Sequence, residues 1–136
     1  MPKTTVTAND TLDAFLRSVD PSWRSGALRY ISLHTASPGV AGTQLTNEAT
    51  YTSYARVAVT GSTGFSAASA ASSANTGTIS FPQCTGGTNT ITFVGIGTAA
   101  SGAGQIIYFG ALTSSLAVAN LILPLFGISA LVATEA

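Results

Sequence analysis

His34 is the only imidazole in the chain and Cys84 is the only thiol, so they are the first residues to consider for nucleophilic chemistry. A hydrolase built on His34 would need a Ser or Cys nucleophile within hydrogen-bond reach and a third group that orients the ring. Four residues could supply that third group: Asp20, Glu48, Asn89 and Asn120. No Gly-x-Ser-x-Gly elbow is present. A small hydrolase that pairs His34 with Cys84 is one hypothesis, but we favour a structural histidine near a strand end.

Two glycine-rich runs, residues 95–98 and 101–104, are superficially similar to phosphate-binding loops. A P-loop requires Gly-Lys-Ser/Thr before a helix, and a dinucleotide site requires G-x-G-x-x-G after a strand with an acid about 20 residues later. Neither condition holds, so we interpret these glycines as turns or positions of close packing. One Cys and one His cannot form a metal site. We therefore predict no catalytic residue, no cofactor and no metal.

Aromatic residues offer a third kind of chemistry, the stacking of aromatic faces on sugar rings. The candidates are Trp23, Tyr30, Tyr51 and Tyr54. Aromatic side chains in strands are more often core or interface anchors. A sugar site also needs polar groups that fix the ligand's orientation, and neighbouring carboxylates and amides are lacking here. We therefore favour packing roles for these residues.

Residues 57–134 contain no Asp, Glu, Lys, Arg or His, and only 7% of the chain is charged. Soluble domains usually carry about a quarter charged residues, and most group-transfer enzymes need acids, bases or metal ligands. The formal net charge is zero, so neither nucleic acid nor an anionic membrane surface is an expected partner. Low repulsion between copies favours association. The first residues lack the apolar run of a secretion signal, so we expect synthesis in a cytoplasm.

One amphipathic helix is predicted near the start, where Leu12, Phe15, Leu16 and Val19 have helical spacing. Residues 9–11 would cap this helix, Pro21 would end it, and its apolar face would pack on a sheet. Residues 1–10 would form an N-terminal arm.

Short β-branched and aromatic runs between Gly or Pro turns predict an antiparallel β-sandwich, jelly-roll-like, as a single domain over residues 11–136. The expected strands are 27–34, 54–60, 78–81, 90–98, 105–112, 116–123 and 125–132. Residues 66–78 could be a loose connection or a flat strand pair. The polar segment 35–53 is long for a loop and is predicted to contact a partner, with Glu48, Tyr51 and Tyr54 as the contact residues.

The strongest signal is an apolar run in which neighbours on both strand faces are hydrophobic. Such a strand is either sandwiched within the monomer or covered by another subunit, and the low charge favours the second. The predicted subunit-interface residues are Leu121, Ile122, Leu123, Leu125 and Phe126. Residues 116–133 are about as long as the shortest membrane helix. Asn120, Pro124, Gly127 and Ser129 interrupt them, so no membrane partner is expected.

Two blocks of the chain resemble a family of small virion proteins of tailed bacteriophages. The first holds YISLHTASPG at 30–39, AGTQ at 41–44, TNE at 46–48 and YARV at 54–57. The second holds ISFP at 79–82, TGG at 85–87, GIGTAASGAG at 95–104, GALT at 110–113 and SLAV at 115–118. The resemblance implies a Gly after Asn120 and small residues near Ile128. Leu121 and Ile128 depart from this family pattern, and these larger apolar side chains favour more burial of the segment.

The resemblance implies a virion structural protein rather than an enzyme. Members are often labelled tail-fibre proteins, and similar β-rich proteins are capsid cement or decoration proteins that sit on shells as trimers. The main prediction is a capsid cement protein that stabilises the head shell. It would form a homotrimer and bind the major capsid protein. The alternative is a tail-fibre or baseplate component that contacts the host surface. Either would lie in the virion after synthesis in the host cytoplasm.

Overall fold

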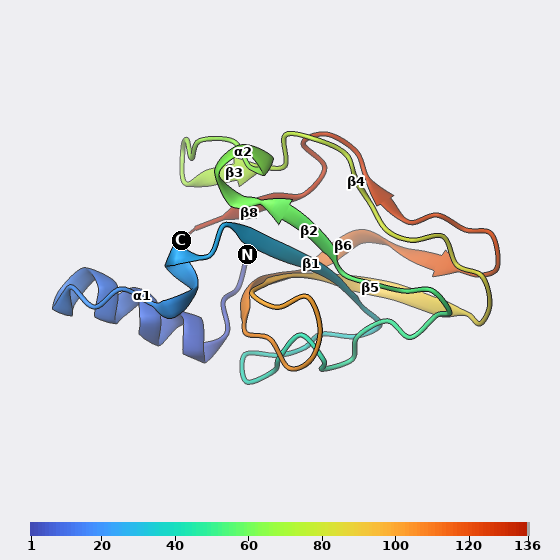
Figure 1. Cartoon of the computed structure of the whole chain (residues 1–136), viewed down its shortest axis with the longest axis horizontal. Helices are drawn as coiled ribbons and strands as arrows, with labels where there is room; N and C mark the ends of the chain where they lie inside the picture. The colour runs from blue at the N-terminus through green and yellow to red at the C-terminus, as the bar shows by residue number, and fades with distance from the viewer. Residues whose placement is uncertain (136) are drawn as a thin grey trace.

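The computed structural model describes residues 1–135 of the chain. Figure 1 shows one N-terminal helix that projects from a β-rich body. In chain order the elements are α1 (Thr5–Arg17), the 3-10 helix η1 (Ser22–Ser25), β1 (Leu28–His34), β2 (Val57–Thr60), the short α2 (Gly61–Gly64), β3 (Ser72–Ala74), β4 (Ile79–Ser80), β5 (Asn89–Gly97), β6 (Ile106–Val118), β7 (Leu125–Phe126) and β8 (Val132–Thr134).

The strands form one four-stranded sheet in the order β2-β1-β5-β6 and two short pairs, β3-β8 and β4-β7. Every pairing is antiparallel. The short pairs lie along one side of the large sheet (Figure 1). The buried core joins Ile31, Leu33, Val94 and Ile96 of the large sheet with Ile79, Phe81 and Leu131 of the opposite layer. The predicted fold class, a mainly antiparallel β-sandwich with one N-terminal helix, is confirmed.

Helix α1 begins earlier than predicted, inside the segment expected to be an arm. Its N-cap is Thr4, whose hydroxyl accepts a hydrogen bond from the Thr7 backbone N–H at 3.5 Å. The hydroxyls of Thr4 and Thr7 also donate to the Ile106 carbonyl, at 2.7 and 2.8 Å. These contacts with β6 start the helix before residues 9–11, so the predicted cap there is wrong. The helix ends at Arg17, before Pro21, and Ser18 follows with φ 55°.

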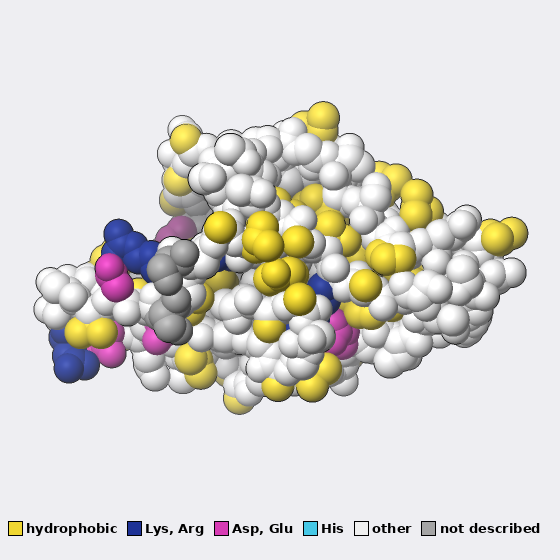
Figure 2. Space-filling model, in the orientation of Figure 1, with side chains coloured by type: hydrophobic (Ala, Val, Ile, Leu, Met, Phe, Trp, Pro, Cys, Tyr) yellow, Lys and Arg dark blue, Asp and Glu magenta, His cyan; other side chains and the backbone are white. Residues whose placement is uncertain are grey.

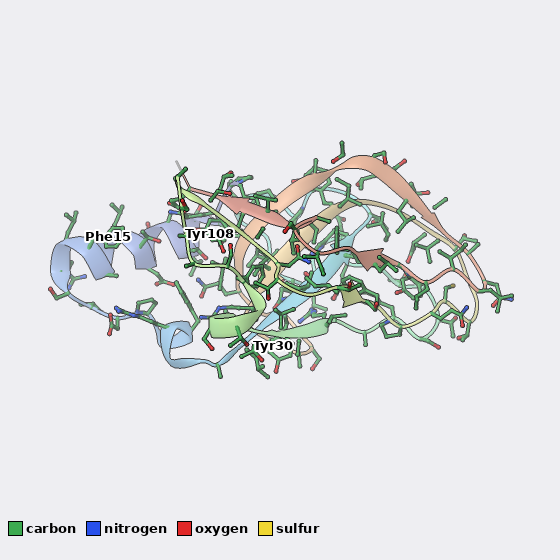
Figure 3. All side chains as sticks on the ribbon, turned by 90° about the horizontal axis from the view of Figure 1, so that it is seen from above. Phe15, Tyr30 and Tyr108 are labelled. Carbon is green, nitrogen blue, oxygen red and sulfur yellow. The ribbon has the colours of Figure 1, made fainter. Side chains whose placement is uncertain are left out.

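The apolar face of α1 does not pack on the sheet, and this part of the prediction is also wrong. The only buried residue of the helix is Thr7 in its first turn. Leu12, Phe15, Leu16 and Val19 are all exposed. Because the helix is held at its first turns and then runs past the edge of the body, its apolar face has no sheet beneath it. Figure 3 shows Phe15 standing out from α1, away from the body.

The C-terminal strands are divided differently from the prediction: β6 is longer than expected, whereas β7 and β8 are short. Strand β6 runs without a break through residues 113–115, and the register between Ile91 and Phe93 shifts to accommodate its extra residues. Residues 121–124 pair with 81–84 through backbone hydrogen bonds but form no strand of their own. Residues 66–78 form a hairpin around Ala70 and Ala71 that leads into β3. No helix among the described residues is long and apolar enough to span a membrane.

Candidate functional site

The long segment 35–53 is held in place by a buried ion pair. Arg56 donates from Nε to Glu48 Oε1 at 2.6 Å and from Nη2 to Glu48 Oε2 at 2.8 Å. The same guanidinium donates to the carbonyls of Ala99 at 3.0 Å and Gly102 at 2.7 Å. The Arg56 side chain is only 2% exposed. One side chain therefore joins this segment to the turn between β5 and β6, and Glu48 has an internal role.

Two tyrosines predicted as partner contacts also lie within the chain. Tyr51 is 3% exposed and donates from its hydroxyl to the Pro82 carbonyl at 3.0 Å. The Tyr54 hydroxyl donates to Glu48 Oε1 at 2.9 Å and accepts from the Leu33 backbone N–H at 3.0 Å. Burial raises the pKa of Tyr51 to about 12, and burial likewise raises that of Tyr54. Each of Glu48, Tyr51 and Tyr54 therefore makes a hydrogen bond within the chain. That they also contact a partner stays a prediction.

The glycine-rich runs make room for a buried amide. Gln44 donates from Nε2 to the Tyr30 carbonyl at 3.1 Å and accepts from the Ala99 N–H at 3.0 Å. A Cβ placed on Gly97 or Gly104 would lie 2.1 or 2.2 Å from the Gln44 side chain. Gly97 and Gly104 are therefore positions of close packing, whereas Gly102 has φ 76° and open space around it, as a turn glycine does.

His34 is fully buried and is held by two neighbours. Its Nδ1 lies 2.8 Å from the Thr46 carbonyl, which can only accept, so Nδ1 carries the proton. Its Nε2 then accepts from Ser32 Oγ at 2.9 Å. Burial lowers the pKa of His34. Sequence reasoning missed this pair, although positions i and i+2 of a strand share a face.

Cys84 does not hydrogen-bond with His34. Its Sγ donates to the Gly86 carbonyl at 3.1 Å, whereas the hydrogen bonds of the His34 ring go to Ser32 and Thr46. Both Cys84 and His34 have no exposed surface. The two residues that a hydrolase would bring together are therefore engaged separately in the interior.

The aromatic candidates for a sugar site do not gather in one place. Tyr51 and Tyr54 pack edge to face at 5.3 Å between ring centres. Trp23 instead donates from Nε1 to Asp10 at 2.9 Å. A pocket of about 270 Å³ contains Trp23 and Tyr108, together with three hydroxyl side chains that already donate to backbone carbonyls of the same chain: Thr7, Thr11 and Ser73. Few polar groups remain there to orient a sugar.

The predicted interface segment is an exposed apolar patch. We call Leu121, Ile122, Leu123, Leu125 and Ile128 the C-terminal patch, because all five side chains are exposed. Leu121 is 69% exposed and has φ 72°, a left-handed conformation that favours glycine. Phe126 turns inward instead, and its ring centre lies 6.2 Å from that of Phe81. The extra burial expected for Leu121 and Ile128 is not found within one chain, and the interface role stays a prediction.

A second apolar surface, which sequence reasoning assigned to the core, lies on α1. We call Leu12, Phe15 and Leu16 of the helix, together with Val19 just beyond its end, the α1 stripe. Phe15 is 80% exposed and Leu16 is 79% exposed. Helix α1 lies at one end of the longest axis, and the segment joining β6 to β7 reaches the other end (Figure 1). On the face in Figure 2, charged side chains gather at the α1 end, and most of the remainder is uncharged.

A groove opens between the two layers of the sandwich. We call it the β6–β7 groove, since residues 111–116 and 124–126 line it together with residues 130–132, Met1, Leu33 and Val94. Its volume is about 570 Å³. Its described lining contains no ionisable side chain, and Leu125 belongs to both the groove and the C-terminal patch. The molecule therefore presents an apolar ridge on α1 and an uncharged hollow elsewhere.

Comparison with known proteins identifies the family of the chain. A family model described as Gp80, podophage GP4 fiber I protein gp80, matches residues 2–132. No curated protein matches the chain. The family match spans both blocks that resemble virion proteins of tailed bacteriophages and confirms that resemblance. The chain belongs to the podophage GP4 fiber I protein family and is a bacteriophage structural protein.

Proposed function

We propose that this protein is a structural subunit of a podophage tail fibre that contacts the host surface and acts without catalysis. The observation that carries the proposal is the family match over residues 2–132, because the family is described as a fibre protein. That description supports the tail-fibre alternative better than capsid cement. The competing hypothesis is a cement or decoration protein on the head of the particle.

The surface of the molecule supports an assembled rather than a solitary state. The α1 stripe and the C-terminal patch expose nine apolar side chains in total: Leu12, Phe15, Leu16, Val19, Leu121, Ile122, Leu123, Leu125 and Ile128. Large contiguous apolar patches on soluble proteins often mark interaction sites, and permanent interfaces are more hydrophobic than transient ones. We therefore propose that the fibre subunit is a homo-oligomer, with the trimer predicted from the resemblance as its expected size.

A non-catalytic role fits the internal engagement of the reactive side chains. His34 and Cys84 are buried and bonded to different neighbours. Glu48 and Arg56 are paired with each other. These groups support the shape of the loop and sheet, and that shape is what a structural subunit contributes.

Locating the protein in intact particles tests the proposal. An antibody against the purified protein, coupled to gold, is expected to label the tail in negative-stain micrographs. Particles incubated with an antibody of unrelated specificity serve as the control. Gold distributed over the head would contradict the fibre role and support capsid decoration. Fitting the structure into a cryo-electron microscopy map of the particle would identify the neighbouring subunits.

A further inference from the structure

The pocket that contains Trp23 and Tyr108 combines a positive charge with aromatic rings. We call it the Trp23 pocket; it lies where the first turns of α1 and the 3-10 helix η1 meet the large sheet and the β3–β8 pair. We propose that this pocket binds the ring of an acidic sugar, of the uronic acid class, through Trp23, Arg29 and Tyr108. The inference rests on the proposed contact with the host surface and names the chemistry that this contact would recognise.

Arg29 supplies the positive charge of the pocket. Its Nη1 donates to the Gly26 carbonyl at 3.0 Å and to the Leu28 carbonyl at 2.9 Å, which holds the guanidinium in place. Its Cζ lies 5.8 Å from the centre of the Trp23 ring. Within the described part of the chain, the hydrogen bonds of this guanidinium all involve Nη1, and no carboxylate pairs with it. The edge formed by Nε and Nη2 is therefore available to a carboxylate, which a guanidinium binds through two parallel hydrogen bonds.

Aromatic rings form the apolar part of the pocket. Trp23, Phe65 and Tyr108 line it, and all three are half-buried, so part of each side chain is accessible. Trp23 is held by the hydrogen bond from its Nε1 to Asp10 at 2.9 Å, and the Tyr108 hydroxyl donates to Glu135. A ring that is already fixed loses little conformational freedom when a ligand packs on it. The pocket is therefore preorganised for a flat ligand with an apolar face.

The hydroxyl groups of the pocket can accept hydrogen bonds from a ligand, but their protons are engaged. Thr11 donates to the Thr7 carbonyl and Ser73 donates to the Ser66 carbonyl, both at 2.8 Å. A hydroxyl has one proton and two lone pairs, so each of these oxygens still offers an acceptor. The pocket thus presents one cationic donor and neutral acceptors. An acidic sugar matches both, because its carboxylate accepts from Arg29 and its ring hydroxyls can donate to Thr11 and Ser73.

The size of the pocket limits the ligand to about one ring. Its volume of about 270 Å³ lies just below the roughly 300–1,000 Å³ of pockets that hold drug-sized ligands. If the acidic sugar belongs to a polysaccharide, the neighbouring sugars would lie outside the pocket. A neutral sugar has the same ring but gains no charge-assisted hydrogen bond from Arg29, and such bonds are roughly twice as strong as neutral ones.

Trp23 is the only tryptophan in the chain, so its signal reports on this pocket alone. In proton–nitrogen NMR spectra of nitrogen-labelled protein, titration with glucuronate should shift the signal of the Trp23 indole N–H. We expect a dissociation constant on the order of 1 mM, as is reasonable for a ligand of one ring. Glucose carries a hydroxymethyl group in place of the carboxylate, and benzoate carries the carboxylate on a ring without hydroxyls. Both should bind about tenfold more weakly or less, because each lacks one half of the match.

Variants separate the charge from the shape of the pocket. Arg29→Gln removes the charge and should weaken glucuronate binding by about tenfold or more. Arg29→Lys keeps the charge without the planar fork and should fall between the two. Ser73→Ala removes one acceptor and should weaken glucuronate binding severalfold. Arg24→Gln, at an exposed position of η1 outside the pocket lining, should bind like the unaltered protein. Circular dichroism would check that each variant is folded.

Three results would overturn the proposed site. The first is that glucose or benzoate binds as tightly as glucuronate. The second is that folded Arg29→Gln, or folded Arg29→Lys together with Ser73→Ala, keeps the affinity of the unaltered protein. The third is a Trp23 signal that does not move at tens of millimolar glucuronate. A shift of that signal with gold labelling on the head would reject the fibre role and keep the site. Labelling of the tail without the shift would reject the site and keep the fibre role.

Discussion

Single buried polar residues join distant segments of this fold. Arg56 bonds to Glu48 and to two carbonyls of the β5–β6 turn. Gln44 fills the space that Gly97 and Gly104 leave. No buried side-chain nitrogen or oxygen among the described residues lacks a hydrogen-bond partner. A buried polar group without a hydrogen-bond partner lowers the free energy of unfolding. Removing one member of these networks therefore also destabilises the groups that were bonded to it.

Replacing Arg56 by Met should lower the free energy of unfolding by about 3–5 kcal/mol, because the largely buried Glu48 carboxylate loses its counter-charge and keeps the Tyr54 hydrogen bond. Urea unfolding followed by circular dichroism would measure the change. Arg17→Met removes a pair of which both side chains are exposed and should change stability by less than about 0.5 kcal/mol. Glu48→Gln combined with Arg56→Met should recover part of the loss. Equal effects of Arg56→Met and Arg17→Met would refute the structural role of the buried pair.

His34 should make stability depend on pH in a defined direction. Burial favours the neutral imidazole and lowers the pKa of His34, and the Arg56 charge lowers it further. The Thr46 hydrogen bond and the Glu48 charge raise the pKa, but burial outweighs them. The unfolded chain therefore binds a proton near pH 6.5 that the folded chain does not. Stability should be full above that pH and should fall as the pH drops below it, by up to about 1.4 kcal/mol per pH unit.

Urea unfolding of the unaltered protein and of His34→Gln, between about pH 8 and about pH 5.5, would measure that slope. The variant is expected to be less stable at every pH but to lose most of the slope in this range, since the chain has no other imidazole. An unchanged slope would show that another group titrates there.

At the scale of elements, one turn adopts a backbone conformation that its residues do not favour. Ala70 and Ala71 have φ 50° and 57° in the hairpin that precedes β3. Ser69 and Ser72 exchange two backbone hydrogen bonds, at 2.9 and 3.0 Å, across this two-residue turn. Two consecutive left-handed residues define a type I′ turn, which usually contains Asn-Gly. The hairpin is therefore maintained by its pairing and not by its turn residues.

Ala71→Gly should raise the free energy of unfolding by about 0.5–1 kcal/mol. The left-handed conformation costs an alanine roughly 1–2 kcal/mol, which exceeds the entropy that glycine adds to the unfolded chain. Thermal unfolding would report the gain. Ala68→Gly, also exposed and outside the left-handed region, should give a loss instead. A loss at both positions would mean that the turn is not strained.

The accuracy of sequence-based prediction also differs between elements. Strands β1 and β5 lie within one residue of the predicted bounds, and each pairs with a neighbour on both sides. The start of α1 has a local N-cap in Thr4, but it also depends on the Ile106 carbonyl, 102 residues later in the chain, which no local pattern indicates. The exposure of Phe15 was equally hidden, since helical spacing shows that a face is apolar but not what covers it.

The candidate surfaces show the same limit. The exposed patch around Leu121 could be predicted, because a strand that is apolar on both faces must be buried either within its own chain or against another subunit. The internal engagement of Glu48 and Tyr54 could not, because it depends on where Arg56 and Leu33 meet them in space. Composition therefore predicted that apolar surface exists, and only the structure showed that part of it lies on α1.

At the scale of the whole molecule, charge and apolar surface are distributed unevenly along the long axis. Charged side chains cluster at the α1 end, and the described residues from 57 to 134 contribute none (Figure 2). Both chain ends are held near each other: the Met1 ammonium donates to the Thr134 carbonyl at 2.8 Å, and Lys3 pairs with Glu135. The first and last segments therefore stabilise each other across the sandwich.

The contact between Thr4, Thr7 and Ile106 has a consequence for synthesis on the ribosome. The helix start is anchored by a carbonyl that lies 102 residues later than Thr4, and Gln44 is anchored by Ala99, which lies 55 residues further along the chain. The Ala99 anchor does not exist until β5 has emerged, and the Ile106 anchor not until β6 begins to emerge. Such distant contacts slow folding. The nascent chain must therefore carry its apolar helix and strands without partners through most of translation, so its risk of aggregation is greatest before the last quarter has been made.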